Sequence, residues 1–337
     1  MRRIWCEALP PAELRADATL RLLARHQLQP IIALSPEKED AAMAAALGAL
    51  SRAGIRVGLW PLLADQDGYW VSARNARSFR RRAEEALAFA ERAGASIRTL
   101  AIDLEPPLDV TRSLLDRRRA RRAVWAGLRE GASSASRIER ARARHSFSAL
   151  RRDLARRGVE SIAAVMPPVI FDLAAAHHPW QAFFGTPLEP PRWDRVCPML
   201  YGSVIGSLLP EGQREAVPAI LHAAAERLVA VVGAERSSAA LGLIGAGKLG
   251  DEPRYEAPEA LARDVAAVRA AGVDDLALFS LEGVLGAEAP ERWLEAFAHA
   301  APRAPSQRWR RAVLSMTFGG LARASGWLGT LGRLAAT

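Results

Sequence analysis

Short apolar runs alternate with longer stretches of helical spacing along most of this 337-residue chain. The runs have the length and the branched apolar content of buried strands, whereas the longer stretches are rich in alanine and repeat their apolar residues every three or four positions. The runs lie at 3–8, 30–35, 55–62, 97–105, 161–167, 195–201, 240–245 and 275–281. Eight such strands alternating with helices predict an α/β fold with a parallel sheet, a (β/α)8 TIM barrel.

The helical stretches divide the chain into a barrel and two additions. They lie at 12–26, 37–53, 76–93, 110–157, near 174, and at 212–232, 258–271 and 291–300. The stretch over about 110–157 is far longer than one barrel helix requires, so it predicts a helical insertion after the fourth strand. We therefore expect a barrel domain over 1–303 and a basic, partly amphipathic C-terminal tail over 304–337.

A doubly wound nucleotide-binding sheet is the competing fold, because "GAGKLG" at 245–250 spells the dinucleotide fingerprint directly after a strand. In that fingerprint a helix begins at once, but here "DEPRYEAPEA" intervenes before helical spacing resumes. In a barrel, a glycine loop after the seventh strand is a common phosphate site, and Lys248 suits that role.

The most informative stretch is "TLAIDLEPP" at 99–107, where two carboxylates stand one residue apart at the end of an apolar run. Alternation along a strand places Asp103 and Glu105 on one face. Barrel enzymes keep their chemistry at the carboxyl ends of the strands, so both acids are expected at the barrel mouth. The same alternation brings Met199 and Tyr201 to the mouth from the sixth strand.

Acids and aromatic residues dominate the other strand ends. The candidates for substrate binding there are Trp60, Asp67, Tyr69, Trp70, Phe279 and Glu282, together with Met199. Aromatic rings can cover the apolar face of a sugar while a carboxyl group delivers a proton to the glycosidic oxygen. Histidine is absent from every predicted strand end, so we expect no metal centre, and the sequence indicates no cofactor.

These residues resemble a known family. "LAIDLE" is similar to the end of the D-x-x-D-x-D-x-E strand motif of the family eighteen glycoside hydrolases, the chitinase-like (β/α)8 barrels, and "PMLY" and "LALFSLEG" are similar to their sixth and closing strands. The resemblance implies that Glu105 is the general acid, that Asp103 orients the N-acetyl group of an amino sugar, and that Tyr201 steadies a cyclic intermediate. The chain departs from the family at Arg98 and Ala101, which replace the two earlier aspartates, and at Gly202 and Phe279.

Three functions stay open. The first is a glycoside hydrolase or transglycosidase, in which Glu105 acts with Asp103 or with another rim carboxylate such as Glu282. The second is a barrel that binds a glycan or a lipid-linked sugar at an anionic membrane surface without cleaving it. The third is a phosphate-handling lyase or isomerase that uses Lys248. An Asp-x-Glu that only caps a helix or binds an arginine is the structural alternative to all three.

The net charge of +9 is concentrated in two segments. The region 112–157 carries 15 arginines and 4 acids, and the region 301–337 carries six arginines and no acid, so the rest of the chain is acidic. No nucleic-acid-binding module is visible, so we expect no nucleic-acid partner. The two basic segments have two interpretations. In the first, the region 112–157 forms solvated helical faces and the tail packs on the barrel. In the second, both segments contact anionic lipid. The first residues lack a secretory signal, which predicts a cytoplasmic protein, peripheral to the inner face of the membrane if the lipid contact is made.

Overall fold

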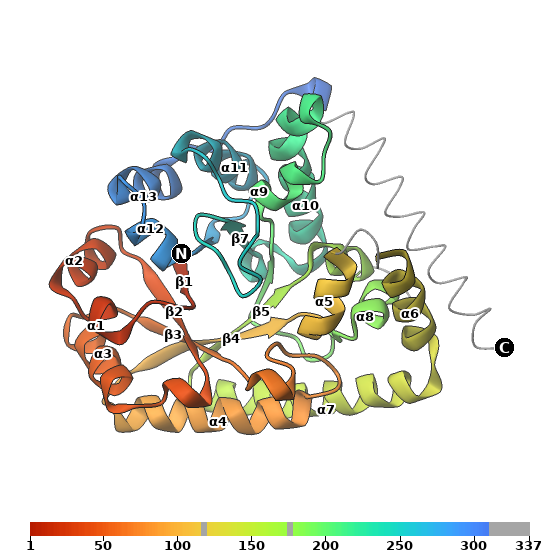
Figure 1. Cartoon of the computed structure of the whole chain (residues 1–337), viewed down its shortest axis with the longest axis horizontal. Coiled ribbons are helices and arrows are strands. Elements are labelled where there is room, and N and C mark those ends of the chain that lie inside the picture. Colours follow the sequence, from red (N-terminus) through yellow and green to blue (C-terminus); the bar gives the residue numbers. More distant parts are fainter. Residues whose placement is uncertain (116–119, 174–177, 310–337) are drawn as a thin grey trace.

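The computed structural model, which describes residues 1–115, 120–173 and 178–309, confirms the predicted (β/α)8 barrel (Figure 1). Eight parallel strands form one sheet in the order β6-β5-β4-β3-β2-β1-β8-β7. Isolated bridges from Val196 to Ser237 and from Met199 to Ala240 bring its two edges together, so the barrel is nearly closed. The strands are β1 Arg2–Cys6, β2 Gln29–Leu34, β3 Val57–Pro61, β4 Ile97–Leu104, β5 Glu160–Val165, β6 Arg195–Pro198, β7 Ser238–Gly242 and β8 Asp275–Phe279.

Helices surround this sheet (Figure 1). They are α1 Pro11–Leu14, α2 Asp17–Arg25, α3 Ala41–Arg52, α4 Ala76–Arg92, α5 Leu108–Leu115, α6 Ala120–Ala132, α7 Ser134–Arg156, α8 Pro179–Phe184, α9 Gly202–Ser207, α10 Val217–Val232, α11 Pro258–Ala270, α12 Leu281–Leu285 and α13 Pro290–His299. The helix predicted from residue 37 begins only at Ala41, because the Asp40 side chain accepts a hydrogen bond from the backbone N–H of Met43 and caps it there.

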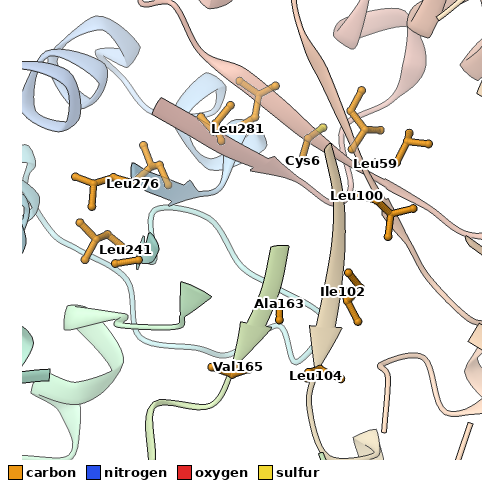
Figure 2. Close-up of a cluster of buried hydrophobic side chains, with 14 of the residues drawn as sticks. Cys6, Leu59, Leu100, Ile102, Leu104, Ala163, Val165, Leu241, Leu276 and Leu281 are labelled. Atoms are coloured by element: carbon orange, nitrogen blue, oxygen red, sulfur yellow. The ribbon is translucent and has the colours of Figure 1, made fainter. Parts of the chain in front are cut away.

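The two faces of each strand pack into separate apolar layers. On β4, Leu100, Ile102 and Leu104 point away from the barrel axis into the layer between sheet and helices, which Figure 2 shows. Ala101, on the opposite face, belongs to the barrel interior with Trp5 and Trp60. This strict alternation is what directs Asp103 inward.

A buried ionic network closes the amino end of the barrel. Arg3 is fully buried, and its Nε and Nη2 donate to the two carboxylate oxygens of Asp275, each at 2.8 Å. Its remaining donors reach Gln29 Oε1 at 2.7 Å and Glu160 Oε2 at 2.8 Å. Four strands are therefore tied together at the end opposite the predicted mouth, where barrels keep residues that serve stability.

The insertion predicted after the fourth strand is helical in its described part and comprises α5, α6 and α7. α7 runs along α4, and α6 packs against α8 beside the carboxyl ends of β4 and β5 (Figure 1). Residues 310–337, most of the predicted tail, and the predicted short helix near 174 lie outside the described residues. Within the residues that are described, no helix is long and apolar enough to cross a membrane.

Candidate active site

The two carboxyl groups of "LAIDLE" meet at the carboxyl end of β4, as the alternation predicts. Asp103 is 4% exposed, and Glu105, which follows the end of the strand, is half-buried. A hydrogen bond joins their side chains. Because a hydrogen bond between two carboxyl groups requires a proton, this pair holds one.

Burial is the main reason why the pair keeps its proton, since it raises the pKa of both carboxyl groups. The charge of Glu7 raises the pKa of Asp103 further, to about 8, although its bond with Glu105 opposes the shift. The same bond and the charge of Asp103 hold the pKa of Glu105 well above its ordinary value. Both carboxyl groups therefore keep their protons to a higher pH than ordinary acids do, and burial together with Asp103 has this effect on Glu105.

Glu7 is a third acid of the site that our sequence interpretation did not single out. It follows β1, is 8% exposed, and accepts a hydrogen bond of 2.5 Å from the Tyr69 hydroxyl at its Oε1. Burial raises its pKa, and the bond from Tyr69 opposes that shift. The signal was present in "RRIWCE", because alternation from Arg3 through Trp5 leads to an inward residue at position 7.

Glu252, in the loop between β7 and α11, is the second acid that sequence reasoning missed. It is half-buried, its Oε1 accepts from the backbone N–H of Leu249 at 3.3 Å, and its charge contributes to the raised pKa of Glu105. The surrounding "DEPRYE" follows no strand directly, so no periodicity indicated which of its acids faces the site.

Tyr201 reaches the same site from the segment that follows β6, and it occupies the N-cap position of α9 without a hydrogen bond from its side chain to that helix. Its ring lies 5.9 Å from that of Phe279. Burial, followed by the charges of Asp103 and Glu105, raises the pKa of Tyr201 well above its ordinary value, so the hydroxyl stays protonated and can donate a hydrogen bond. The structure thus brings together the three residues predicted to be catalytic.

The segment after β3 covers part of the mouth. Tyr69 and Trp70 are buried against each other with their ring centroids 5.7 Å apart, whereas Asp67 is exposed. Lys248 lies 4.2 Å over the Tyr69 ring and pairs with Asp65 at 2.9 Å. The lysine considered for a phosphate site is therefore held by an acid of the rim.

The other predicted substrate-binding residues are mainly interior. Trp60, Met199 and Phe279 are each less than 10% exposed and fill the barrel, where Trp60 meets Trp5 edge-on at 5.1 Å. Packing accounts for this burial, and a contact between these three side chains and a substrate stays a prediction.

Glu282 has a positioning role in the structure. Its Oε1 accepts hydrogen bonds from the backbone N–H groups of Glu7 at 3.1 Å and of Ala8 at 3.2 Å. It therefore fixes the segment that carries Glu7, and its charge raises the pKa of Glu7. A direct role of Glu282 as the partner of Glu105 stays a prediction.

The acids of the mouth suit proton transfer. Among the residues that the structure describes, no group of three or more His, Cys, Asp and Glu side chains is arranged to hold a metal ion. A neutral Glu105 can donate a proton to an oxygen atom that becomes negative as a bond breaks, and Asp103 can take up the resulting charge through their shared hydrogen bond. The arrangement therefore fits general acid catalysis.

Known structures share the fold at low similarity. No protein-family model matches the chain, and no curated protein sequence matches it. The PgaB (BpsB) glycoside hydrolase domain from Bordetella bronchiseptica is 13% identical, with a TM-score of 0.49 over 88% of this chain and 99% of that one. A chitinase from Chromobacterium violaceum is 15% identical, with a TM-score of 0.49 over 88% and 97%. D-allulose 3-epimerase from Methylomonas sp. is 12% identical, with a TM-score of 0.44 over 82% and 83%. Likeness at this level describes the barrel fold alone.

The raised pKa of Asp103 predicts how stability depends on pH. Between about pH 4 and pH 8 the folded state holds a proton that the unfolded chain has lost, so this group lowers stability as the pH rises through that window. We expect Asp103→Asn to remove this loss and to gain stability relative to wild type, by at least about 1 kcal/mol, on going from pH 5 to pH 8. Urea unfolding at both pH values measures the difference.

The matched control is Asp67→Asn, which removes an exposed carboxyl group of the same rim. We expect its difference from wild type to be the same at both pH values. If Asp103→Asn behaves like this control, Asp103 is already ionised at neutral pH in the folded protein.

Gly202, which stands directly after Tyr201, makes room for a second buried pair. A Cβ atom at this position would lie 1.9 Å from Asp264 Oδ2 and 2.6 Å from the Tyr255 hydroxyl, which itself donates to Asp264 at 2.5 Å. We expect Gly202→Ala to destabilise the fold by about 1–3 kcal/mol, because the new methyl group overlaps these atoms. Thermal unfolding checks this. Gly206→Ala, in the same helix, has only an ordinary contact of 3.4 Å and should leave the midpoint almost unchanged.

Proposed function

We propose that this protein is a glycoside hydrolase or transglycosidase in which Glu105 protonates the glycosidic oxygen. The observation that supports the proposal is the buried Asp103–Glu105 pair at the carboxyl end of β4, where burial raises the pKa of both carboxyl groups. A general acid must hold its proton at the working pH and release it during bond cleavage, and burial beside Asp103 raises the pKa of Glu105 as the first of these needs requires.

Tyr201 and Glu7 assist this step, Tyr201 as a hydrogen-bond donor and Glu7 as a source of negative charge. The hydroxyl of Tyr201 donates a hydrogen bond to the substrate beside the breaking bond. Glu7, fixed by Tyr69, supplies negative charge that stabilises the positive sugar ring of the transition state. Lys248 and Asp65 form part of the rim over which the sugar enters.

We further propose an amino sugar as the substrate, in line with the resemblance to the family eighteen glycoside hydrolases. Asp103 then faces an N-acetyl group, whose carbonyl oxygen attacks the sugar carbon from within the substrate. The support is the match of Asp103, Glu105 and Tyr201 to that motif. Ala101 stands where the family motif has its middle aspartate. In this chain Glu7 therefore supplies the negative charge that the missing aspartate would have supplied.

A panel of chromogenic glycosides tests the proposal, with N-acetylglucosaminides and N-acetylgalactosaminides beside the corresponding glucosides and galactosides. We expect turnover of at least one N-acetylated member and none of its counterpart with a free hydroxyl. Turnover of unacetylated glycosides alone would support the hydrolase activity but contradict the proposal that the substrate is an amino sugar. Saturable binding of oligosaccharides without turnover would instead identify a glycan-binding barrel and contradict the enzyme.

A further inference from the structure

A cavity of about 180 Å³ lies between the helical insertion and the barrel, and its lining residues are distinct from the acids of the mouth. Its walls come from the segment after β3, from α5 and α6, from α7 and from α8. Gly127 and Gly131 stand one turn apart on α6, and a Cβ at Gly131 would meet the backbone oxygen of Ala182 at 2.6 Å. Glycine at these positions thus lets α6 approach α8 closely enough to form one wall of the cavity.

Arg140 of α7 lines this cavity and is only 8% exposed. Its Nη2 donates to the backbone oxygen of Gly131 at 2.8 Å, but its buried Nη1 has no hydrogen-bond partner in the part of the chain that the structure describes. Burial and the nearby charges of Arg144 and Arg137 lower the pKa of Arg140. A buried guanidinium with an unused donor is costly, and an anion beside Nη1 would remove that cost.

Ser72 gives the cavity a second unused donor. Its side chain is 1% exposed and lines the cavity, and its Oγ has no partner among the described residues, while its backbone N–H bonds to Asn75 Oδ1 at 2.8 Å. Ser72 follows β3 and Arg140 lies in α7, so two residues from separate parts of the chain line one cavity, and each has a buried polar atom without a partner among the described residues. This convergence is typical of a ligand site.

The remaining lining limits the charge and the shape of the ligand. Arg74 is paired with Glu130, and Glu139 adds another negative charge, so the walls favour one negative charge over two. Most other lining residues are apolar, including Phe183 and Phe184, whose rings meet at 4.9 Å. A cavity of about 150 Å³ holds a benzene molecule, so this one admits an apolar body of that size.

We propose that this cavity binds a small carboxylic acid with an apolar body. Its carboxylate accepts hydrogen bonds from Arg140 Nη1 and Ser72 Oγ, and its apolar part lies against the phenylalanines of α8. Arginine is suited to carboxylates because its planar donors match the two oxygens. This site is separate from the acid pair, so its test needs no enzymatic activity.

Calorimetric titration with benzoate, phenyl phosphate and benzamide tests the proposal on the full chain. We expect benzoate to bind at least tenfold more tightly than neutral benzamide, and more tightly than phenyl phosphate, which carries a second charge. Arg140→Gln should weaken benzoate binding at least tenfold, whereas Arg142→Gln, an exposed arginine of the same helix, should leave it unchanged.

Ser72→Ala provides a variant that should keep the fold, because the Ser72 hydroxyl has no hydrogen-bond partner among the described residues. We expect it to weaken benzoate binding about fivefold. Absence of benzoate binding to the wild type would overturn the proposal, as would equal binding by wild type, Arg140→Gln and Ser72→Ala. Tighter binding of phenyl phosphate than of benzoate would overturn the assignment of a carboxylate.

Discussion

Replacing Glu105 with Gln should lower the turnover of the hydrolysed glycoside by about 100-fold or more, which is the usual contribution of a positioned general acid. The amide is nearly the same size as the acid and can donate a hydrogen bond to Asp103, so the fold should be retained. It has no proton to transfer, so the loss should fall on kcat and leave KM nearly unchanged. Steady-state kinetics with a substrate from the glycoside panel measures both.

Two comparisons make this result specific. Glu256→Gln, which changes an exposed acid of the loop before α11, should retain wild-type kinetics. A substrate whose leaving group needs no protonation should also recover much of its turnover with Glu105→Gln, because the missing proton then matters less. Wild-type turnover of an unactivated glycoside by Glu105→Gln would assign the proton donor to another residue.

The alternating pattern along the chain predicted the architecture and the centre of the site because both depend on local periodicity. Each of the eight strands lies within a few residues of its predicted range, and the shared face of Asp103 and Glu105 follows from a period of two. The helix predicted at 12–26 is interrupted instead, since Ala16 adopts an extended conformation between α1 and α2. Alanine and arginine favour helix on both sides, so no local signal marks this break.

The rest of the site depends on contacts between distant segments. Tyr69 meets Glu7 across 62 positions of the chain, and Lys248 meets Asp65 across 183 positions. These contacts depend on the conformations of loops, which neither the composition of the chain nor the spacing of its residues specifies. The same holds for Trp60, which alternation places correctly on the inner face but whose burial beneath the mouth depends on its packing against Trp5.

The largest effect on stability should come from the opposite end of the barrel. Arg3 is fully buried and serves Asp275, Glu160 and Gln29, so Arg3→Met leaves two acids with a lost partner. We expect the free energy of unfolding to fall by about 3–5 kcal/mol at pH 7, because the buried Asp275 then keeps only the more distant Arg195, at 3.6 Å. Arg25→Met, which breaks the exposed pair with Glu291, should cost less than about 1 kcal/mol.

The pH dependence identifies the cause of that loss. Burial alone would raise the pKa of Asp275, but the hydrogen bonds and charge of Arg3 outweigh burial and leave the pKa lowered. A lowered folded pKa gives stability that is present above the unfolded pKa of about 4 and is lost as the pH falls through the folded value. Without Arg3, burial is opposed only by the smaller effects of Arg195 and the N-terminus, so the pKa of Asp275 should rise. The gap between wild type and Arg3→Met should then widen as the pH rises from 4 to 7. Urea unfolding across that range measures the gap.

The double variant Arg3→Met with Asp275→Asn tests the same cause. It should recover part of the stability lost by Arg3→Met at pH 7, because the buried charge is gone. A gap between wild type and Arg3→Met that is the same at every pH would assign the loss to packing and not to charge.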